Sequence, residues 1–180
     1  TFCDDYIELV KDRANDFSGS HDATAVHSAR TALAIAVDTF VRLFAPFLPF
    51  VTEEVWSWYR TGSVHRSAWP QAAGLRAAAG GANAGLVTRA GLALAALRKV
   101  KSEAKTSQRT PILSVAVTAE PAVADAIESV RTDLIEAAKV TGPFEVARTP
   151  ASADSSVSPV SVTTVELGEA PARSRSTKRS

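Results

Sequence analysis

Basic residues are concentrated in one part of the sequence, and they are the first candidates for a ligand-binding role. Between positions 89 and 109 there are six Lys or Arg and one acidic residue, whereas the whole chain of 180 residues carries a net charge of only +1. Arg98, Lys101 and Lys105 are three and four residues apart, so we expect them to line one face of a helix. A row of cations can follow a phosphate backbone, and a solvated helix face is the alternative. We predict these three residues as phosphate contacts.

A second segment combines aromatic rings with cations. Unstacked RNA bases need ring faces for stacking and donors for their edges. We expect Trp58 and one other aromatic residue of this segment to belong to the core. The segment holds Trp56, Trp58, Tyr59 and Trp69 beside Arg60, His65 and Arg66. The predicted contacts to bases are the cations that flank the first helix and the extended segment, namely Lys11, Arg13, His65 and Arg66.

Signatures of catalysis are missing from the sequence. It contains no glycine-rich phosphate loop followed by Lys-Ser or Lys-Thr, and no Cys or His pair at the spacing of zinc ligands. Glu53 and Glu54 are adjacent and point to different sides of a helix, so we expect them to stabilise a helix N-terminus. We therefore predict no catalytic residue, no metal site and no cofactor in this chain. The single Cys3 is expected to pack as a small hydrophobe in a reducing, cytoplasmic setting.

The elements that position these residues are predicted to be mainly helical in the first part of the chain. Apolar residues recur at helical spacing in 4–13, in 22–44 and in 86–104, and Asp22 can cap the second of these helices. Pro46 should end that helix, and Pro49 should open another, in which Val51, Val55 and Trp58 form the apolar stripe. We predict an antiparallel bundle over 1–70, a flexible Ala/Gly linker over 71–85 and a long basic helix over 86–108.

The last part of the chain changes from helical periodicity to alternation. We expect a strand over 112–118, helices over 121–130 and 132–139, with Thr132 as a cap and Gly142 as a C-terminal cap, and strands over 144–148 and 160–167. These elements form a small α/β subdomain of β-α-α-β-β order over 109–168. The polar and basic residues 169–180 are expected to be disordered.

Length and composition agree with one domain plus an appendage. The sequence contains no Met, so we expect it to be a piece of a longer protein. Its longest uncharged apolar stretches are far shorter than the roughly 18 residues of a membrane span, and we therefore expect no membrane partner.

Three runs of residues resemble the anticodon-binding region of class Ia aminoacyl-tRNA synthetases. They are FCDDYIELVKDR at 2–13, FAPFLPFVTEEVW at 44–56, and SVHR at 63–66 followed by Trp69-Pro70. The second run is the most specific of them. YIELVK at 6–11 and LRKVKSEAK at 97–105 look most like the valyl branch of these enzymes. The chain lacks the heptads with which many members of that branch end.

The resemblance implies a helical bundle that binds the anticodon stem-loop of a valine tRNA, with the middle adenine and last cytosine of the anticodon as the informative bases. Activation of valine with ATP and Mg would take place in upstream domains of the same protein, so this fragment should be inactive alone. The nearer alternative is the same region of an isoleucyl enzyme. The alternative of another class is a protein-interaction module whose basic helix binds an acidic partner without RNA.

Overall fold

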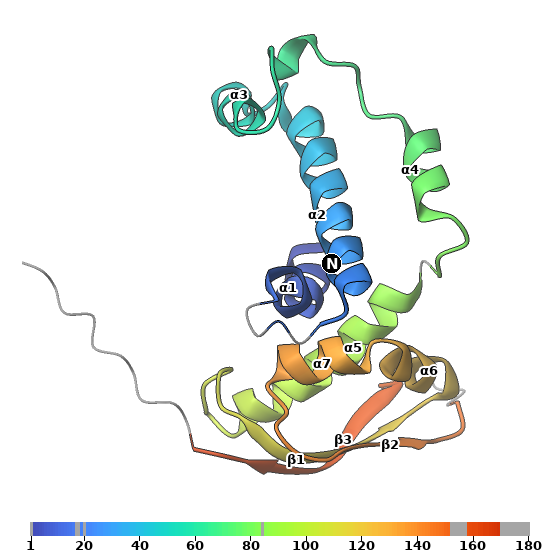
Figure 1. The fold of residues 1–180 in the computed structure, drawn as a ribbon. Helices are drawn as coiled ribbons and strands as arrows, with labels where there is room; N and C mark the ends of the chain where they lie inside the picture. The colour runs from blue at the N-terminus through green and yellow to red at the C-terminus, as the bar shows by residue number, and fades with distance from the viewer. Residues whose placement is uncertain (1, 17–18, 20, 84, 152–157, 170–180) are drawn as a thin grey trace, which may run out of the picture. The chain divides into compact units, whose positions relative to one another are not determined.

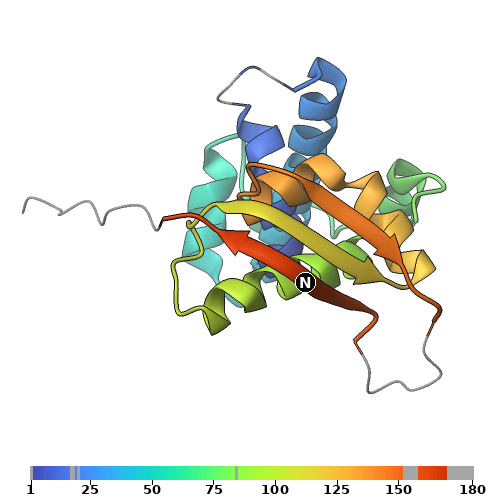
Figure 2. The same ribbon diagram turned by 90° about the horizontal axis from the view of Figure 1, so that it is seen from below.

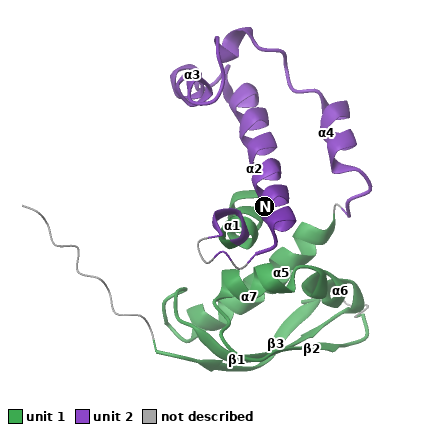
Figure 3. Cartoon of the chain, viewed as in Figure 1, with its two compact units in different colours: residues 1–12, 84–180 green, residues 13–83 purple. Residues whose placement is uncertain are grey.

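The computed structural model describes residues 2–16, 19, 21–83, 85–151 and 158–169 (Figure 1). These residues form a mainly α protein with one small sheet, which confirms the mainly α class expected from the sequence. The chain divides into two compact units, one of residues 1–12 with 84–180 and the other of residues 13–83 (Figure 3). Each unit is described by itself below.

The unit of residues 13–83 holds the long helix α2 (Ala23–Phe44), followed by α3 (Pro49–Ser57), a 3-10 turn η2 (Val64–Arg66) and α4 (Ala72–Ala79). Asp22 caps α2, because its side chain accepts a hydrogen bond of 3.1 Å from the amide of Ala25. Pro49 occupies the first turn of α3 as the sequence predicts, since a missing amide costs nothing there.

The core of this unit is small. It is formed by residues of α2, of α3 and of the segment after α3: Val41, Ala45, Trp56 and Val64 are buried together, and Val55 packs against them. The apolar positions Val37, Phe40 and Phe44 of α2 stay exposed in the described structure, although their helical spacing predicts a buried face. Helix α4 lies within 71–85, where the sequence predicts a linker, and none of its residues is buried.

The unit of residues 1–12 and 84–180 begins with a π-helical turn η1 (Phe2–Ile7) that leads into α1 (Glu8–Asn15). It continues with α5 (Gly85–Glu103), β1 (Ile112–Ala119), α6 (Pro121–Ser129), α7 (Arg131–Ala138), β2 (Phe144–Arg148) and β3 (Val160–Leu167). The predicted strands and helices of 112–167 are therefore confirmed within one or two residues at each end. Arrangement of the helices as an antiparallel bundle over 1–70 with 86–108 stays a prediction.

The three strands form one mixed sheet in the order β2-β1-β3. Strand β1 pairs in parallel with β2, with Val115 opposite Phe144, and antiparallel with β3, with Ile112 opposite Leu167. Helices α5, α6 and α7 cover the same face of this sheet (Figures 1 and 2). Residues that are almost fully buried between the two layers include Leu94, Leu97, Ile112, Ile127 and Leu134.

Several local predictions for this unit are wrong. Cys3 is exposed and does not pack as a small hydrophobe. Gly142 is not a C-terminal cap: the left-handed residue after α7 is Lys139, with φ 57°, and Gly142 lies where a Cβ atom would come within 2.0 Å of the carbonyl oxygen of Leu113. Val130, not Thr132, precedes α7 as its N-terminal flanking residue. Helix α5 ends at Glu103, before Lys105. The predicted disordered tail falls almost entirely outside the described residues.

Candidate nucleic-acid interface

Several aromatic rings are exposed between the turn that precedes α3 and the residue that follows it. Phe50 is 90% exposed, Phe47 77% and Trp58 70%. Thr52 and Trp56 are buried one helical turn apart and Val55 packs against the same core, so Phe50 and Val51 are left on the outer side of α3. Exposed aromatic faces of this kind are what single-stranded bases stack on.

The prediction that Trp58 belongs to the core is wrong. Trp56 is the buried tryptophan, at 8% exposure, and its ring contacts that of Tyr59 edge-on at 5.7 Å. The indole nitrogen of Trp58 donates a hydrogen bond of 3.1 Å to the carboxylate of Glu54 at the surface. The buried residues of α3 are Thr52 and Trp56, so the buried stripe includes a polar residue. The hydroxyl of Thr52 donates a hydrogen bond of 2.8 Å to the carbonyl of Leu48.

His65 and Arg66 are presented by a turn that Glu53 holds in place. The carboxylate of Glu53 accepts hydrogen bonds of 3.0 Å from the hydroxyl of Ser63 and from the amide of Val64. Glu53 lies beyond the first turn of α3, so it does not act at the helix N-terminus as predicted. His65 lies with its Nε2 atom 3.3 Å from the carbonyl oxygen of Pro49, and Arg66 is exposed with no side-chain hydrogen bond to the described residues.

Other cations of the same unit are engaged by Asp38. Its carboxylate binds Arg42 and, at 3.1 Å, Arg60. The Arg60 guanidinium also lies 5.8 Å from the ring centre of Tyr59, a distance at which cation–π attraction is significant. Burial, together with the negative charge of Asp38, raises the pKa of Tyr59 above its usual value. These contacts fix the α2–α3 corner and leave Arg66 as the more available cation near η2.

The two candidates for base contacts in α1 fall in different units. Lys11 belongs to the unit of residues 1–12 and 84–180, where its ammonium binds the carboxylate of Glu8 at 2.7 Å. Arg13 belongs to the other unit, together with His65 and Arg66, and is partly buried. The structure therefore brings three of the four predicted residues into one unit, and His65 and Arg66 into one turn.

The predicted row of phosphate contacts is not a surface row, because Lys101 is only 1% exposed. Its ammonium donates to the backbone carbonyls of Ala138, at 2.6 Å, and Gln108, at 3.0 Å. Arg98 is half-buried and binds Glu8 at 3.1 Å, while Lys105 lies past the end of α5 with φ 52°. Lys101 is therefore buried inside the unit rather than aligned with Arg98 and Lys105 at the surface.

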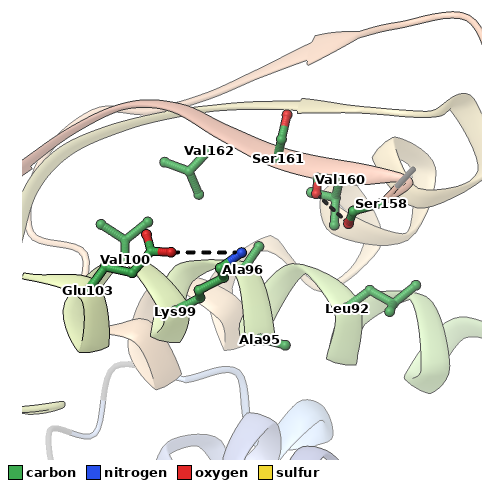
Figure 4. A pocket seen from close by; sticks show the side chains of 10 residues that line it. All are labelled: Leu92, Ala95, Ala96, Lys99, Val100, Glu103, Ser158, Val160, Ser161 and Val162. Carbon is green, nitrogen blue, oxygen red and sulfur yellow. Dashed lines mark hydrogen bonds and ion pairs between the residues drawn. The ribbon is translucent and has the colours of Figure 1, made fainter. Parts of the chain in front are cut away.

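A shallow groove of about 380 Å³ runs between α5 and β3 (Figure 4). Its wall on the helix is formed by small and apolar residues such as Ala96 and Val100, and its rim holds the ion pair of Lys99 with Glu103 at 3.8 Å. On the strand side, the hydroxyl of Ser158 donates to the carbonyl of Val160 at 2.7 Å. These residues supply apolar contact and one ion pair, and they do not combine a nucleophile with a base.

Neither a metal cluster nor a membrane-spanning helix is present among the residues that the structure describes. Within 2–16, 19, 21–83, 85–151 and 158–169, no three His, Cys, Asp or Glu side chains gather where they could hold a metal ion. None of the helices described there has the length and apolar character needed to cross a membrane.

Residues 1–117 match the family described as the anticodon-binding domain of tRNA ligase, and the chain belongs to this family. This match covers more than half of the chain and includes both α2–α3 and α5.

Relatives indicate which branch of the family the chain is most similar to. It is 48% identical to a valine–tRNA ligase of Bifidobacterium longum (strain DJO10A) over 182 aligned residues, which cover 96% of this chain and 20% of that protein. It is 50% identical to a valine–tRNA ligase of Cutibacterium acnes (strain DSM 16379 / KPA171202), over 77% of this chain and 16% of that protein. The chain thus spans about a fifth of the length of the first of these relatives.

Proposed function

We propose that this chain is the anticodon-binding region of a valine–tRNA ligase and that it binds the anticodon stem-loop of a valine tRNA. The observation that carries the proposal is the similarity to valine–tRNA ligases over nearly the whole chain, together with the family match over residues 1–117. The relatives described above favour this function over that of the isoleucyl enzyme.

Base recognition is assigned to the turn η2 and the rings around it. Arg66 and His65 offer donors for base edges, and the exposed Trp58 and Trp69 offer faces for stacking in the same unit. Arg13 and Lys11 remain candidates for the same role. Lys11 would have to leave its ion pair with Glu8 in order to reach a base.

Backbone contacts are assigned to cations that the structure leaves accessible. Lys105 is exposed, and Arg98 presents part of its guanidinium beside Glu8. Contacts of this kind supply affinity that falls with salt, and they position the RNA without reading its sequence.

Valine activation is assigned to the part of the ligase that lies outside this chain. ATP and Mg would act there, and the tRNA bound here would be charged there, in the cytoplasm. We expect the chain alone to show no valine-dependent pyrophosphate exchange above that of a heat-killed control, because it carries no nucleotide-binding motif.

The second candidate function is a protein-interaction module. The exposed Phe47, Phe50 and Trp58 favour it, since exposed aromatic residues are also common at protein interfaces.

Binding of three stem-loops tests both functions. The chain is titrated with stem-loops that carry the valine anticodon, the isoleucine anticodon and a valine anticodon mutated at its middle and last bases. Tightest binding of the first supports the proposal. Preference for the second indicates the isoleucyl function, and equal or absent binding of all three contradicts anticodon recognition and favours the interaction module.

A further inference from the structure

A cavity of about 120 Å³ lies in the unit of residues 1–12 and 84–180, among α1, α5, the end of α7 and the segment after α5. Glu8 is the acidic residue among those that line it. The basic residues that line it are Lys11, Arg98, Lys101, Arg109 and Lys139. We call this site the basic cavity.

The ion pairs of the basic cavity leave it with excess positive charge. Glu8 is shared by Lys11, at 2.7 Å, and Arg98, at 3.1 Å. Lys139 binds Asp12 at 2.9 Å. Two carboxylates therefore face the five basic residues, and three positive charges stay uncompensated by the ion pairs of the described residues. Like charges that line one cavity repel one another, and an anion placed among them relieves the repulsion.

Lys101 contributes charge to the basic cavity without an acidic partner. Its ammonium is buried against the carbonyl oxygens of Ala138 and Gln108, which accept two hydrogen bonds from it but do not neutralise it. Burial, and then the positive charges of Lys139 and Arg98, lower the pKa of Lys101. The same two neighbours therefore raise the electrostatic potential at Lys101, one of the residues that line the cavity.

Arg109 is suited to bind an oxyanion. Its side chain is exposed and makes no hydrogen bond or ion pair with the described residues, so its guanidinium is available for two parallel hydrogen bonds to a phosphate.

Lys139 is held at the cavity by an unusual backbone conformation. It adopts φ 57° and ψ 46° after α7, at a position where Gly or Asn is the common residue. A larger residue in this left-handed region is uncommon, and such residues cluster at functional sites. Lys139 lines the cavity together with Lys101 and Arg109.

We propose that the basic cavity is a phosphate-binding site, and that a backbone phosphate of the bound tRNA occupies it with Arg109 and Lys139 as its direct partners. This assignment of the RNA rests on the proposed function. The phosphate chemistry of the site does not, because it follows from the cavity, the charge excess and the exposed guanidinium.

Two double variants with equal loss of charge test the site. Arg109→Gln with Lys139→Asn removes the two direct partners, and Asn tolerates the left-handed conformation. The control, Lys99→Gln with Arg148→Gln, removes one Lys and one Arg of the same unit that are exposed, that each form one ion pair and that lie outside the lining of the cavity. Melting temperatures show whether both double variants fold. If Arg109→Gln with Lys139→Asn does not fold, Arg109→Gln alone is used as the cavity variant.

Inorganic phosphate is the first probe, and it does not depend on the proposed function. Amide chemical shifts of the chain are followed during a phosphate titration at constant ionic strength. We expect saturable shifts at residues 109 and 139 that persist in the control and are lost in the cavity variant.

Whole valine tRNA is the second probe. We expect the cavity variant to bind it about tenfold more weakly and to flatten the slope of log Kd against log salt by about 0.7 to 0.9, as for one lost phosphate contact, with a smaller effect in the control.

Phosphate shifts with an unchanged salt slope would overturn the assignment to RNA and leave a site for free phosphate. A changed slope without phosphate shifts supports the RNA phosphate. Equal effects in both double variants, or no effect in either experiment, would overturn the site. If the unmutated chain shows the phosphate shifts but does not bind valine tRNA, the proposed function is refuted instead.

Discussion

The ammonium of Lys101 donates a hydrogen bond of 2.6 Å to the carbonyl oxygen of Ala138, the last residue of α7. Carbonyls at a helix C-terminus lack partners within the helix, and here a buried lysine from α5 satisfies one of them. The same ammonium donates to the carbonyl of Gln108, so one side chain joins the end of α7 to the segment that follows α5. This lysine therefore has a structural role that its charge alone does not suggest.

Replacement of Lys101 by Met should lower the free energy of unfolding by about 2 kcal/mol at neutral pH, because two carbonyls lose their donor. Burial lowers the pKa of Lys101 in the folded chain below its value in the unfolded chain. Between these two values the unfolded state binds more protons, so the stability of the wild type rises with pH, by at most about 1.4 kcal/mol per unit. Urea unfolding of both proteins from pH 7 to 10.5 should therefore show a difference that widens with pH. A difference that shrinks over this range would contradict the burial of the amine.

The position of Lys101 shows how far the sequence could predict the candidate site. Ala90, Leu94, Leu97 and Lys101 follow one another at intervals of four, three and four residues, and all are buried. The helical pattern of α5 thus contains the signal that Lys101 faces inward. The charge pattern indicates the opposite: because buried lysines are rare, cations at helical spacing favour an exposed row on the helix surface.

Strands and helices of 112–167 could be predicted because their signals are local. The alternation of Val115 and Val117 with small or polar residues is sufficient to predict strand β1, and the proline at the start of α6 is sufficient to predict where that helix begins. The strand order β2-β1-β3 and the presence of Arg109 and Lys139 in one cavity lining could not be predicted, since both depend on packing between segments about 30 to 55 residues apart. Burial of Trp56 rather than Trp58 depends on where α3 meets α2, which the period alone does not determine.

Gly142→Ala should be strongly destabilising. A Cβ atom at this position would lie 2.0 Å from the carbonyl oxygen of Leu113, a backbone atom that also belongs to the sheet region. The backbone must shift to relieve the overlap, and we expect a loss of about 2 to 3 kcal/mol in unfolding experiments.

Gly74→Ala in α4 is the matched control for that substitution. Nothing lies within 4 Å of a Cβ atom there, and alanine favours a helix by about 0.5 to 1 kcal/mol over glycine. We expect unchanged or higher stability. Similar losses for both variants would show that the close approach at Gly142 is not the cause.

Glu53→Ala should weaken the turn that carries His65 and Arg66. The carboxylate accepts two hydrogen bonds, from Ser63 and Val64, and its removal should lower the free energy of unfolding by about 1 to 3 kcal/mol. Glu54→Ala, which removes one exposed contact to Trp58, should change it by less than about 0.5 kcal/mol. Chemical denaturation of the two variants measures both effects, and equal losses would show that Glu53 does not hold the turn.

Arg66→Ala should reduce discrimination between anticodons rather than overall affinity for RNA. Arg66 is exposed beside His65 in η2, in the same unit as the exposed Trp58 and Trp69, so its guanidinium can reach a base that stacks on a ring. Loss of a base contact of this kind costs about 1 to 3 kcal/mol for the cognate base. Titrations at fixed salt should therefore show the ratio of Kd values between anticodon-mutated and valine stem-loops falling by about tenfold.

Arg76→Ala is the control for this experiment, because Arg76 is an exposed arginine of α4 in the same unit. It removes the same charge at a different place, and we expect the ratio of Kd values to stay as in the wild type. Melting temperatures of the two variants should agree, since neither side chain contributes to the core of the unit. If Arg66→Ala weakened binding of both stem-loops equally, Arg66 would be a phosphate contact, and the reading of anticodon bases would have to be assigned to Arg13, Lys11 or His65. If it changed neither, η2 would not form part of the RNA interface.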